Sequence, residues 1–153
     1  MLKQLFNIDL VFSDVNLESQ EDVFSFLESE LHPKGYINND WKQAIMARED
    51  SYPTGLAFEG VQIAIPHVGV EYIKKPYVAI LKPSKAITFN HMAYVSDPVD
   101  AEFIINLGIT EPDKQVLLLQ ELMNIFGNND LVSLIKEKGV VKGFNNIILS
   151  CGY

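Results

Sequence analysis

The residues with the clearest chemical potential lie between Arg48 and His67. His67 follows Pro66 directly, after a stretch, 61–65, whose apolar and polar residues alternate as in a half-buried strand. Ligands of open α/β sheets usually bind at the carboxyl ends of strands, and proline fixes φ just before the imidazole. Because the ordinary histidine pKa is ~6.5, such a residue can be a neutral nucleophile or a proton carrier. His67 is therefore a candidate nucleophile, although a lone histidine after a strand is more often a surface or hydrogen-bonded residue.

Arg48 and Thr54 are candidates to hold an anion near His67. Arg48 comes near the end of a predicted helix, 40–50, and continues its apolar stripe. Its stem could pack on the core with the guanidinium in water, favoured by the helix C-terminus. Alternatively, the planar guanidinium could bind phosphate oxygens. The helix leads almost directly into Pro53-Thr54-Gly55, a turn signal that offers a hydroxyl and an unhindered backbone.

Gln115 is the fourth candidate and belongs to a predicted helix from about Glu111 to Phe126. The start of this helix, with Thr110 as the hydroxyl cap and Pro112 in the first turn, is typical of a helix N-terminus. Gln115 falls on the apolar face. It could be a capping or core-edge amide, or an uncharged donor to an anion at the helix N-terminus.

The composition restricts the class of protein. The 153 residues fit one domain, 1–153, and 48% of them are hydrophobic, which is enough for a core. The net charge of −8 with only 12 Lys and Arg argues against a nucleic-acid binder and suits a basic protein partner. There is no apolar run of ~18 residues, no signal-peptide pattern, and a single cysteine, Cys151, so we expect a cytoplasmic protein.

Two classes of ligand have no motif in the sequence. A Gly-x-x-x-x-Gly-Lys loop is missing, which argues against a nucleoside triphosphate, and no cluster has metal-ligand spacing. We therefore expect no cofactor and no metal. Cys151 has no cysteine or histidine partner at ligand spacing, and neither His32 nor His91 lies in a recognisable motif.

The order of the predicted elements favours an α/β fold with a mixed β-sheet flanked by helices on both faces. Strands and helices are interspersed, and the segments between strands differ in length, which argues against an all-parallel sheet. The clearest alternating strand is 99–107. Ser19 and Asp22 have capping-box spacing, and Asn39 is expected to cap the next helix. The strands are predicted near 10–12, 61–65, 76–81, 86–89 and 99–107, and the helices near 19–31, 40–50, 111–126, 130–138 and 141–150.

Three motifs occur in an order that resembles a known family. Ala47-Arg48-Glu49, Pro53-Thr54-Gly55 and Ile63-Ala64-Ile65-Pro66-His67 resemble the IIA components of the bacterial sugar phosphotransferase system, mannitol/fructose type. The galactitol-specific branch is the most similar, because Asp40-Trp41-Lys42-Gln43-Ala44 and Tyr52-Pro53-Thr54-Gly55 also have counterparts there. The similarity covers most of the chain, from the helix after Ser19 to the last one, and implies the fold of that family.

The resemblance also implies a function. The histidine phosphocarrier protein would give its phosphoryl group to His67, which would pass it to a cysteine on a IIB component. That component phosphorylates a sugar or hexitol, galactitol-like here, which enters through the membrane IIC component. Arg48 would match the family's arginine near the phosphohistidine. Many mannitol and fructose members carry a second histidine where this chain has Gln115, whereas the galactitol branch has a glutamine. The departure supports that branch and puts in doubt a mechanism with two imidazoles.

The implied chemistry agrees with the residues themselves. Phosphoryl transfer needs an in-line nucleophile and electrostatic support. One arginine with Thr54, backbone amides and Gln115 gives moderate support, which lets the phosphoryl group leave again. Two other functions stay open. The chain could be a regulatory protein in which phosphorylation of His67 controls the binding of a partner, or a binding module in which His67 is structural.

Overall fold

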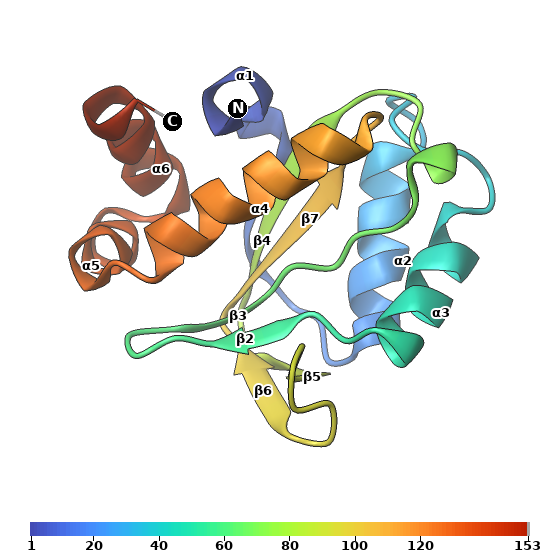
Figure 1. The fold of residues 1–153 in the computed structure, drawn as a ribbon, viewed down its shortest axis with the longest axis horizontal. Coiled ribbons are helices and arrows are strands. Elements are labelled where there is room, and N and C mark those ends of the chain that lie inside the picture. Colours follow the sequence, from blue (N-terminus) through green and yellow to red (C-terminus); the bar gives the residue numbers. More distant parts are fainter. Residues whose placement is uncertain (153) are drawn as a thin grey trace.

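The computed structural model describes residues 1–152 and has a mixed five-stranded sheet at its centre (Figure 1). The strand order is β1-β4-β7-β3-β2; β1 is parallel to β4 and β3 to β7, whereas β4–β7 and β2–β3 are antiparallel. A separate antiparallel pair, β5–β6, lies at one end of the sheet. The strands are β1 (Val11–Val15), β2 (Gly55–Ala57), β3 (Gln62–Ala64), β4 (Tyr77–Pro83), β5 (Ile87–Asn90), β6 (Pro98–Ala101) and β7 (Phe103–Gly108).

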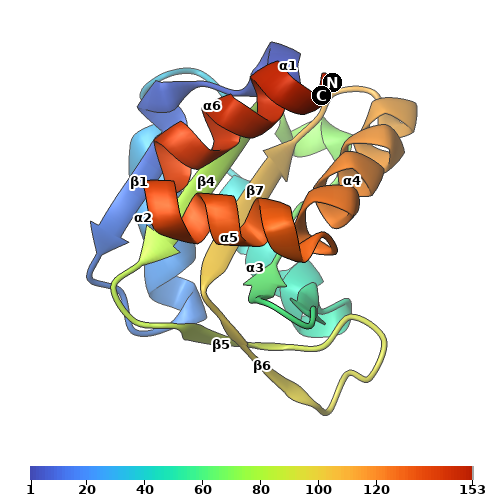
Figure 2. The same ribbon diagram turned by 90° about the vertical axis from the view of Figure 1, so that its left-hand side faces the viewer.

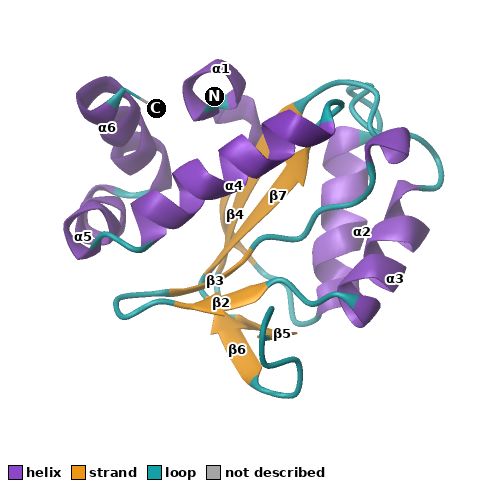
Figure 3. Cartoon of the chain, viewed as in Figure 1, coloured by secondary structure: helices purple, strands orange, loops and turns teal. Residues whose placement is uncertain are grey.

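Helices cover both faces of this sheet, which confirms the predicted fold class. One face carries α1, α4, α5 and α6, and the opposite face carries α2 and α3 (Figures 2 and 3). The helices are α1 (Leu2–Leu5), α2 (Gln20–Leu31), α3 (Trp41–Ser51), α4 (Pro112–Phe126), α5 (Asn129–Lys138) and α6 (Val140–Cys151); two short 3-10 turns are η1 (Ile8–Leu10) and η2 (Val70–Tyr72). None of these helices within residues 1–152 has the length and apolarity needed to cross a membrane.

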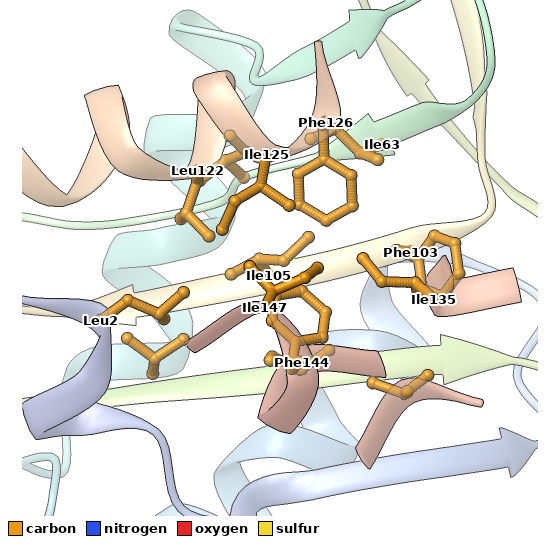
Figure 4. Close-up of a cluster of buried hydrophobic side chains, with 14 of the residues drawn as sticks. Leu2, Ile63, Phe103, Ile105, Leu122, Ile125, Phe126, Ile135, Phe144 and Ile147 are labelled. Atoms are coloured by element: carbon orange, nitrogen blue, oxygen red, sulfur yellow. The ribbon is translucent and has the colours of Figure 1, made fainter. Parts of the chain in front are cut away.

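Each face of the sheet has its own apolar core. Alternate residues of a strand point to opposite faces, so β4 and β7 supply side chains to both cores. Ile105 belongs to the core under α4, α5 and α6, where it packs with residues such as Leu122 and Phe144 (Figure 4). Tyr77 and Ile104 belong to the core under α2 and α3. Because both faces are covered, all residues of β7 and all of β4 except the half-buried Lys82 are buried.

The helix starts agree only in part with the sequence predictions. The Ser19 cap is confirmed: its hydroxyl oxygen accepts a hydrogen bond from the Asp22 amide at 3.1 Å, and the Asp22 carboxylate accepts one from the Glu18 amide at 3.0 Å. The caps assigned to Asn39 and Thr110 are wrong. The N-cap residues of α3 and α4 are Asp40 and Glu111, and neither makes a capping hydrogen bond through its side chain.

The predicted strand 99–107 is two strands. It breaks at Glu102, whose amide donates to the Gln62 carbonyl at 2.8 Å and whose carboxylate accepts from the Gln62 amide at 3.1 Å. The first part, β6, pairs with β5, and the second, β7, enters the central sheet between β4 and β3. The break lets one apolar run serve two sheets, which alternation alone does not predict.

Candidate functional site

A hollow of about 350 Å³ brings together residues that are far apart in the sequence. It lies where the end of α3, the segment before β2, the segment after β3, the β5–β6 loop and α4 meet. Three of the four predicted site residues are among those that line it. The lining residues are Arg48, Ser51, Tyr52, Pro53, Thr54, His67, Met92, Val95 and Leu119.

His67 is held at the wall of this hollow by its own backbone neighbours. It lies just beyond β3, forms a parallel bridge with Leu107 of β7, and keeps 9% of its surface exposed. Its Nδ1 lies 2.7 Å from the carbonyl oxygen of Ile65. Because a carbonyl can only accept, Nδ1 must carry the proton and donate it. The Nε2 atom therefore keeps the lone pair, and it is the nucleophilic nitrogen of this arrangement.

The surroundings of His67 favour its neutral form. Burial lowers the pKa of His67 below its ordinary value, and the positive charge of Arg48 lowers this pKa further. The hydrogen bond to the Ile65 carbonyl opposes both effects, but burial has the largest effect. A neutral imidazole with its lone pair available at physiological pH is what nucleophilic attack on phosphorus requires.

If His67 accepts a phosphoryl group, as the resemblance implies, its lowered pKa predicts how the rate of acceptance depends on pH. As the pH falls from about 8 through the ordinary histidine pKa of ~6.5, we expect the rate to stay near its maximum, because His67 remains neutral. The rate should fall only at lower pH. The same lowered pKa makes the free energy of unfolding depend on pH. The stability contributed by neutral His67 is fully present above pH ~6.5 and is lost as the pH falls toward the lowered pKa, because the unfolded chain takes up the proton first.

Single-turnover rates measured across this pH range would test the prediction. The donor protein has its own titrating groups, so the His67 pKa should also be measured directly by NMR titration of the ring. A His67 pKa at or above ~6.5 would contradict the prediction.

A buried network supports the backbone just before His67. The Asn106 side chain donates from Nδ2 to the Pro66 carbonyl at 3.0 Å, and the Tyr77 hydroxyl donates to Asn106 Oδ1 at 2.6 Å. Burial raises the pKa of Tyr77 well above its usual value, so this hydroxyl stays a donor. Gly108 leaves room for the ring, because a Cβ there would lie 1.9 Å from Tyr77 Cε1.

Asn106 was missed as a functional residue. The alternating pattern of its strand indicates that Asn106 lies on the polar side, facing solvent. In the structure it is fully buried under α2 and α3. Once both faces of a strand are covered, a polar residue inside an apolar run is a buried hydrogen-bonding group, and that is the signal that could have found it.

Arg48 lines the hollow from the exposed side of α3, not from the buried side that the sequence predicts. The sequence placed it on the buried side of its helix, but the buried residues of α3 are Trp41, Ile45 and Glu49, and Arg48 is exposed. Its guanidinium carbon lies 5.4 Å from the centre of the Tyr52 ring. Within residues 1–152 no carboxylate lies within ion-pair distance of Arg48, so its donors remain available to an anion in the hollow.

Thr54 is a buried wall residue whose hydroxyl is already engaged. Only 2% of it is exposed, and both its amide and its hydroxyl donate to the Glu49 carboxylate at 2.9 Å. The next residue is a glycine because the chain passes close to β5 at this point. A Cβ at Gly55 would lie 2.6 Å from the Asn90 carbonyl oxygen. Glu49 was also missed, although its spacing of four from Ile45 and eight from Trp41 placed it on the buried stripe.

Gln115 is not among the residues that line the hollow. It is half-buried near the start of α4, and Leu119, one turn later on the same face, is the lining residue from this helix. Its role as a second donor therefore stays a prediction. His91 instead organises the β5–β6 loop, where its Nδ1 accepts from the amides of Ala93 and Tyr94.

Replacement of Gln115 by histidine should be tolerated. Because the side chain is half-buried at an element start and has no hydrogen bond within the described residues, we expect the free energy of unfolding to change by less than about 1 kcal/mol. Urea unfolding of the Gln115→His variant beside the wild type would measure this change. Loss of the folded state would contradict the placement of Gln115 near solvent.

Comparisons with known proteins identify the family and the fold of this chain. The chain matches the family described as "Phosphoenolpyruvate-dependent sugar phosphotransferase system, EIIA 2" over residues 4–151. It is 29% identical over 125 residues, 82% of this chain and 83% of the relative, to the galactitol-specific EIIA component of the sugar phosphotransferase system of Escherichia coli K12.

Two solved structures share the fold. One is the complex of enzyme IIAMTL with phosphorylated enzyme IIBMTL from Escherichia coli, which is 20% identical, with a TM-score of 0.72 over 94% of this chain and 96% of that one. The other is the nitrogen regulatory protein IIA-Ntr from Neisseria meningitidis, which is 17% identical, with a TM-score of 0.73 over 95% of each chain.

Proposed function

Because the chain belongs to the EIIA 2 family of the phosphoenolpyruvate-dependent sugar phosphotransferase system, and is thus a phosphotransferase component, we propose that it carries a phosphoryl group on Nε2 of His67. The observation that carries the proposal is the 2.7 Å contact between His67 Nδ1 and the Ile65 carbonyl. This contact leaves Nε2 as the unprotonated nitrogen of a ring that lines an open hollow.

The transfer exchanges one nitrogen–phosphorus bond for another. The Nε2 lone pair attacks phosphorus in line, the bond between phosphorus and the donor's histidine breaks, and the donor's ring regains its electron pair. Positive charge develops on the His67 ring as the new bond forms. The Ile65 carbonyl oxygen, which accepts a hydrogen bond from Nδ1 at 2.7 Å, stabilises that charge, and no proton has to leave the ring.

Arg48 supplies the main positive charge for the phosphoryl oxygens. It lines the same hollow, and its charge acts on His67. In the structure the Thr54 hydroxyl donates to Glu49, so Thr54 would act mainly as a wall of the site. One exposed arginine gives moderate stabilisation, which suits a group that must be accepted and then released.

We propose the histidine phosphocarrier protein as the donor and a cysteine of a IIB component as the acceptor. The IIB component would phosphorylate a sugar that enters through a membrane IIC component. The structural relative solved with its phosphorylated IIB partner supports the choice of acceptor. The galactitol-specific relative, together with Gln115 in place of a second histidine, favours a galactitol-like hexitol.

Intact mass measured on the folded wild-type protein tests this proposal. After incubation with phosphoenolpyruvate, enzyme I and the histidine phosphocarrier protein, we expect one added phosphoryl group per chain. The group should then disappear when a IIB component is added. A folded protein that takes up no phosphoryl group would overturn the proposal and favour a binding module.

The similarity to IIA-Ntr supports a second candidate, in which phosphorylation of His67 controls binding to a partner protein. Both candidates predict phosphorylation, and they differ in the next step. A phosphorylated chain that passes its group to no galactitol-type, mannitol-type or fructose-type IIB component would favour the regulatory role.

A further inference from the structure

A buried carboxylate, Glu49, lies behind the hollow and has no part in the proposed transfer. It is only 4% exposed, and within residues 1–152 no basic group lies within ion-pair distance of it. Burial raises the pKa of Glu49, although the two hydrogen bonds from Thr54 oppose that effect. Burying a carboxylate without a basic partner costs free energy, and its hydrogen bonds offset this cost only in part. A functional role would explain why Glu49 is there.

Glu49 is the first member of a continuous chain of hydrogen bonds that ends on the imidazole. Its carboxylate accepts from the Thr54 amide and hydroxyl at 2.9 Å. The Thr54 carbonyl accepts from the Ile65 amide at 3.2 Å, which extends the β2–β3 ladder by one pair. The Ile65 carbonyl then accepts from His67 Nδ1 at 2.7 Å.

The network of Asn106 and Tyr77 on the other side of His67 makes no hydrogen bond with the imidazole ring. Asn106 holds the Pro66 carbonyl and so fixes the backbone before His67, but the hydrogen bond on the ring itself comes from Ile65. The position of the Ile65 carbonyl therefore decides which ring nitrogen carries the proton. That position depends on Thr54, and Thr54 depends on Glu49.

We propose that Glu49 is a positioning residue for His67. By holding Thr54 it fixes the Ile65 carbonyl, which keeps the proton on Nδ1 and leaves Nε2 as the nucleophile. The kinetic part of this inference rests on the proposed phosphocarrier function, whereas the tautomer of His67 can be measured without any transfer.

The test compares Glu49→Ala and Glu49→Gln with an Asp50→Ala control. Asp50 is the next residue of the same helix, carries the same charge, and is exposed. The first readout is the tautomer of His67 in the unphosphorylated protein, from the ¹⁵N shifts of the ring. The second is the steady-state kinetics of phosphoryl acceptance from the histidine phosphocarrier protein.

We expect Glu49→Ala to give a mixture of His67 tautomers and to lower kcat about tenfold, because small displacements of reacting atoms are costly. KM for the donor should change less than about twofold, since Glu49 is buried behind the hollow and presents almost no surface to a donor protein. Glu49→Gln should keep kcat within about threefold of the wild type. The side-chain oxygen of glutamine can still accept a hydrogen bond from the Thr54 backbone amide, and its NH2 group can donate one to the Thr54 hydroxyl. Asp50→Ala should behave as the wild type.

A Glu49→Ala protein with the wild-type tautomer and kcat would overturn the inference, as would a raised KM with unchanged kcat. If Glu49→Ala does not fold, Glu49→Leu replaces it, because leucine fills the buried space but accepts no hydrogen bond from the Thr54 amide or hydroxyl; a wild-type tautomer in that variant would equally overturn the inference. If the wild type accepts no phosphoryl group but the tautomer changes as expected, the proposed function fails and the positioning role stands.

Discussion

An His67→Ala variant is expected to accept no phosphoryl group at all while it remains folded. The physical reason is that His67 is the one histidine among the described residues that line the hollow, and in the proposed transfer its Nε2 forms the bond to phosphorus. The side chain contributes a single hydrogen bond, to Ile65, so its removal should cost about 1 kcal/mol of stability. Intact mass after incubation with phosphoenolpyruvate, enzyme I and the histidine phosphocarrier protein measures the loss.

Matched controls come from the two other histidines. His32→Ala and His91→Ala should each take up one phosphoryl group as the wild type does, because neither residue lines the hollow. Addition of the group to both wild type and His67→Ala would show that another residue is the nucleophile, and His91 in the neighbouring loop would be tested next. Far-UV circular dichroism of each variant shows whether a loss of transfer reflects unfolding.

The second large effect concerns Arg48. Arg48→Ala should slow phosphoryl acceptance about 100-fold, because removal of one preorganised donor to transition-state charge typically costs that much or more. The fold should remain intact, with a change in unfolding free energy within about 0.5 kcal/mol, since the side chain is exposed and lacks an ion pair in the described chain. Rapid-quench measurement of single-turnover transfer from the phosphorylated donor would give the rate.

Arg48→Lys separates charge from geometry. Lysine keeps the positive charge but lacks the planar pair of donors that matches phosphate oxygens, so an intermediate rate is expected. Equal rates for arginine, lysine and alanine at this position would rule out the role of Arg48 in binding the phosphoryl group. The pKa of His67 should rise in Arg48→Ala, because the charge of Arg48 lowers it in the wild type.

Local sequence signals predicted most of the fold. Alternation of side chains depends on neighbours two residues apart, and helical stripes depend on neighbours three and four residues apart, so both can be read along the chain. The fold class, the strand that leads to His67 and the approximate extent of the helices followed from these patterns. The sequence was misleading where distant segments decide the outcome, as at Glu102, where contact with Gln62 divides one apolar run into two strands.

The sequence by itself determined the chemical identity of the site: a histidine after a strand, an arginine at a helix end and a threonine in a turn. Only the tertiary structure decided how these residues and their neighbours are buried and hydrogen-bonded. Arg48 is exposed while Glu49 is buried, Asn106 is covered by helices, and the Ile65 carbonyl selects the protonated nitrogen of His67. The physical reason is that burial and backbone hydrogen bonding depend on segments that pack from elsewhere in the chain, and these set tautomer and pKa.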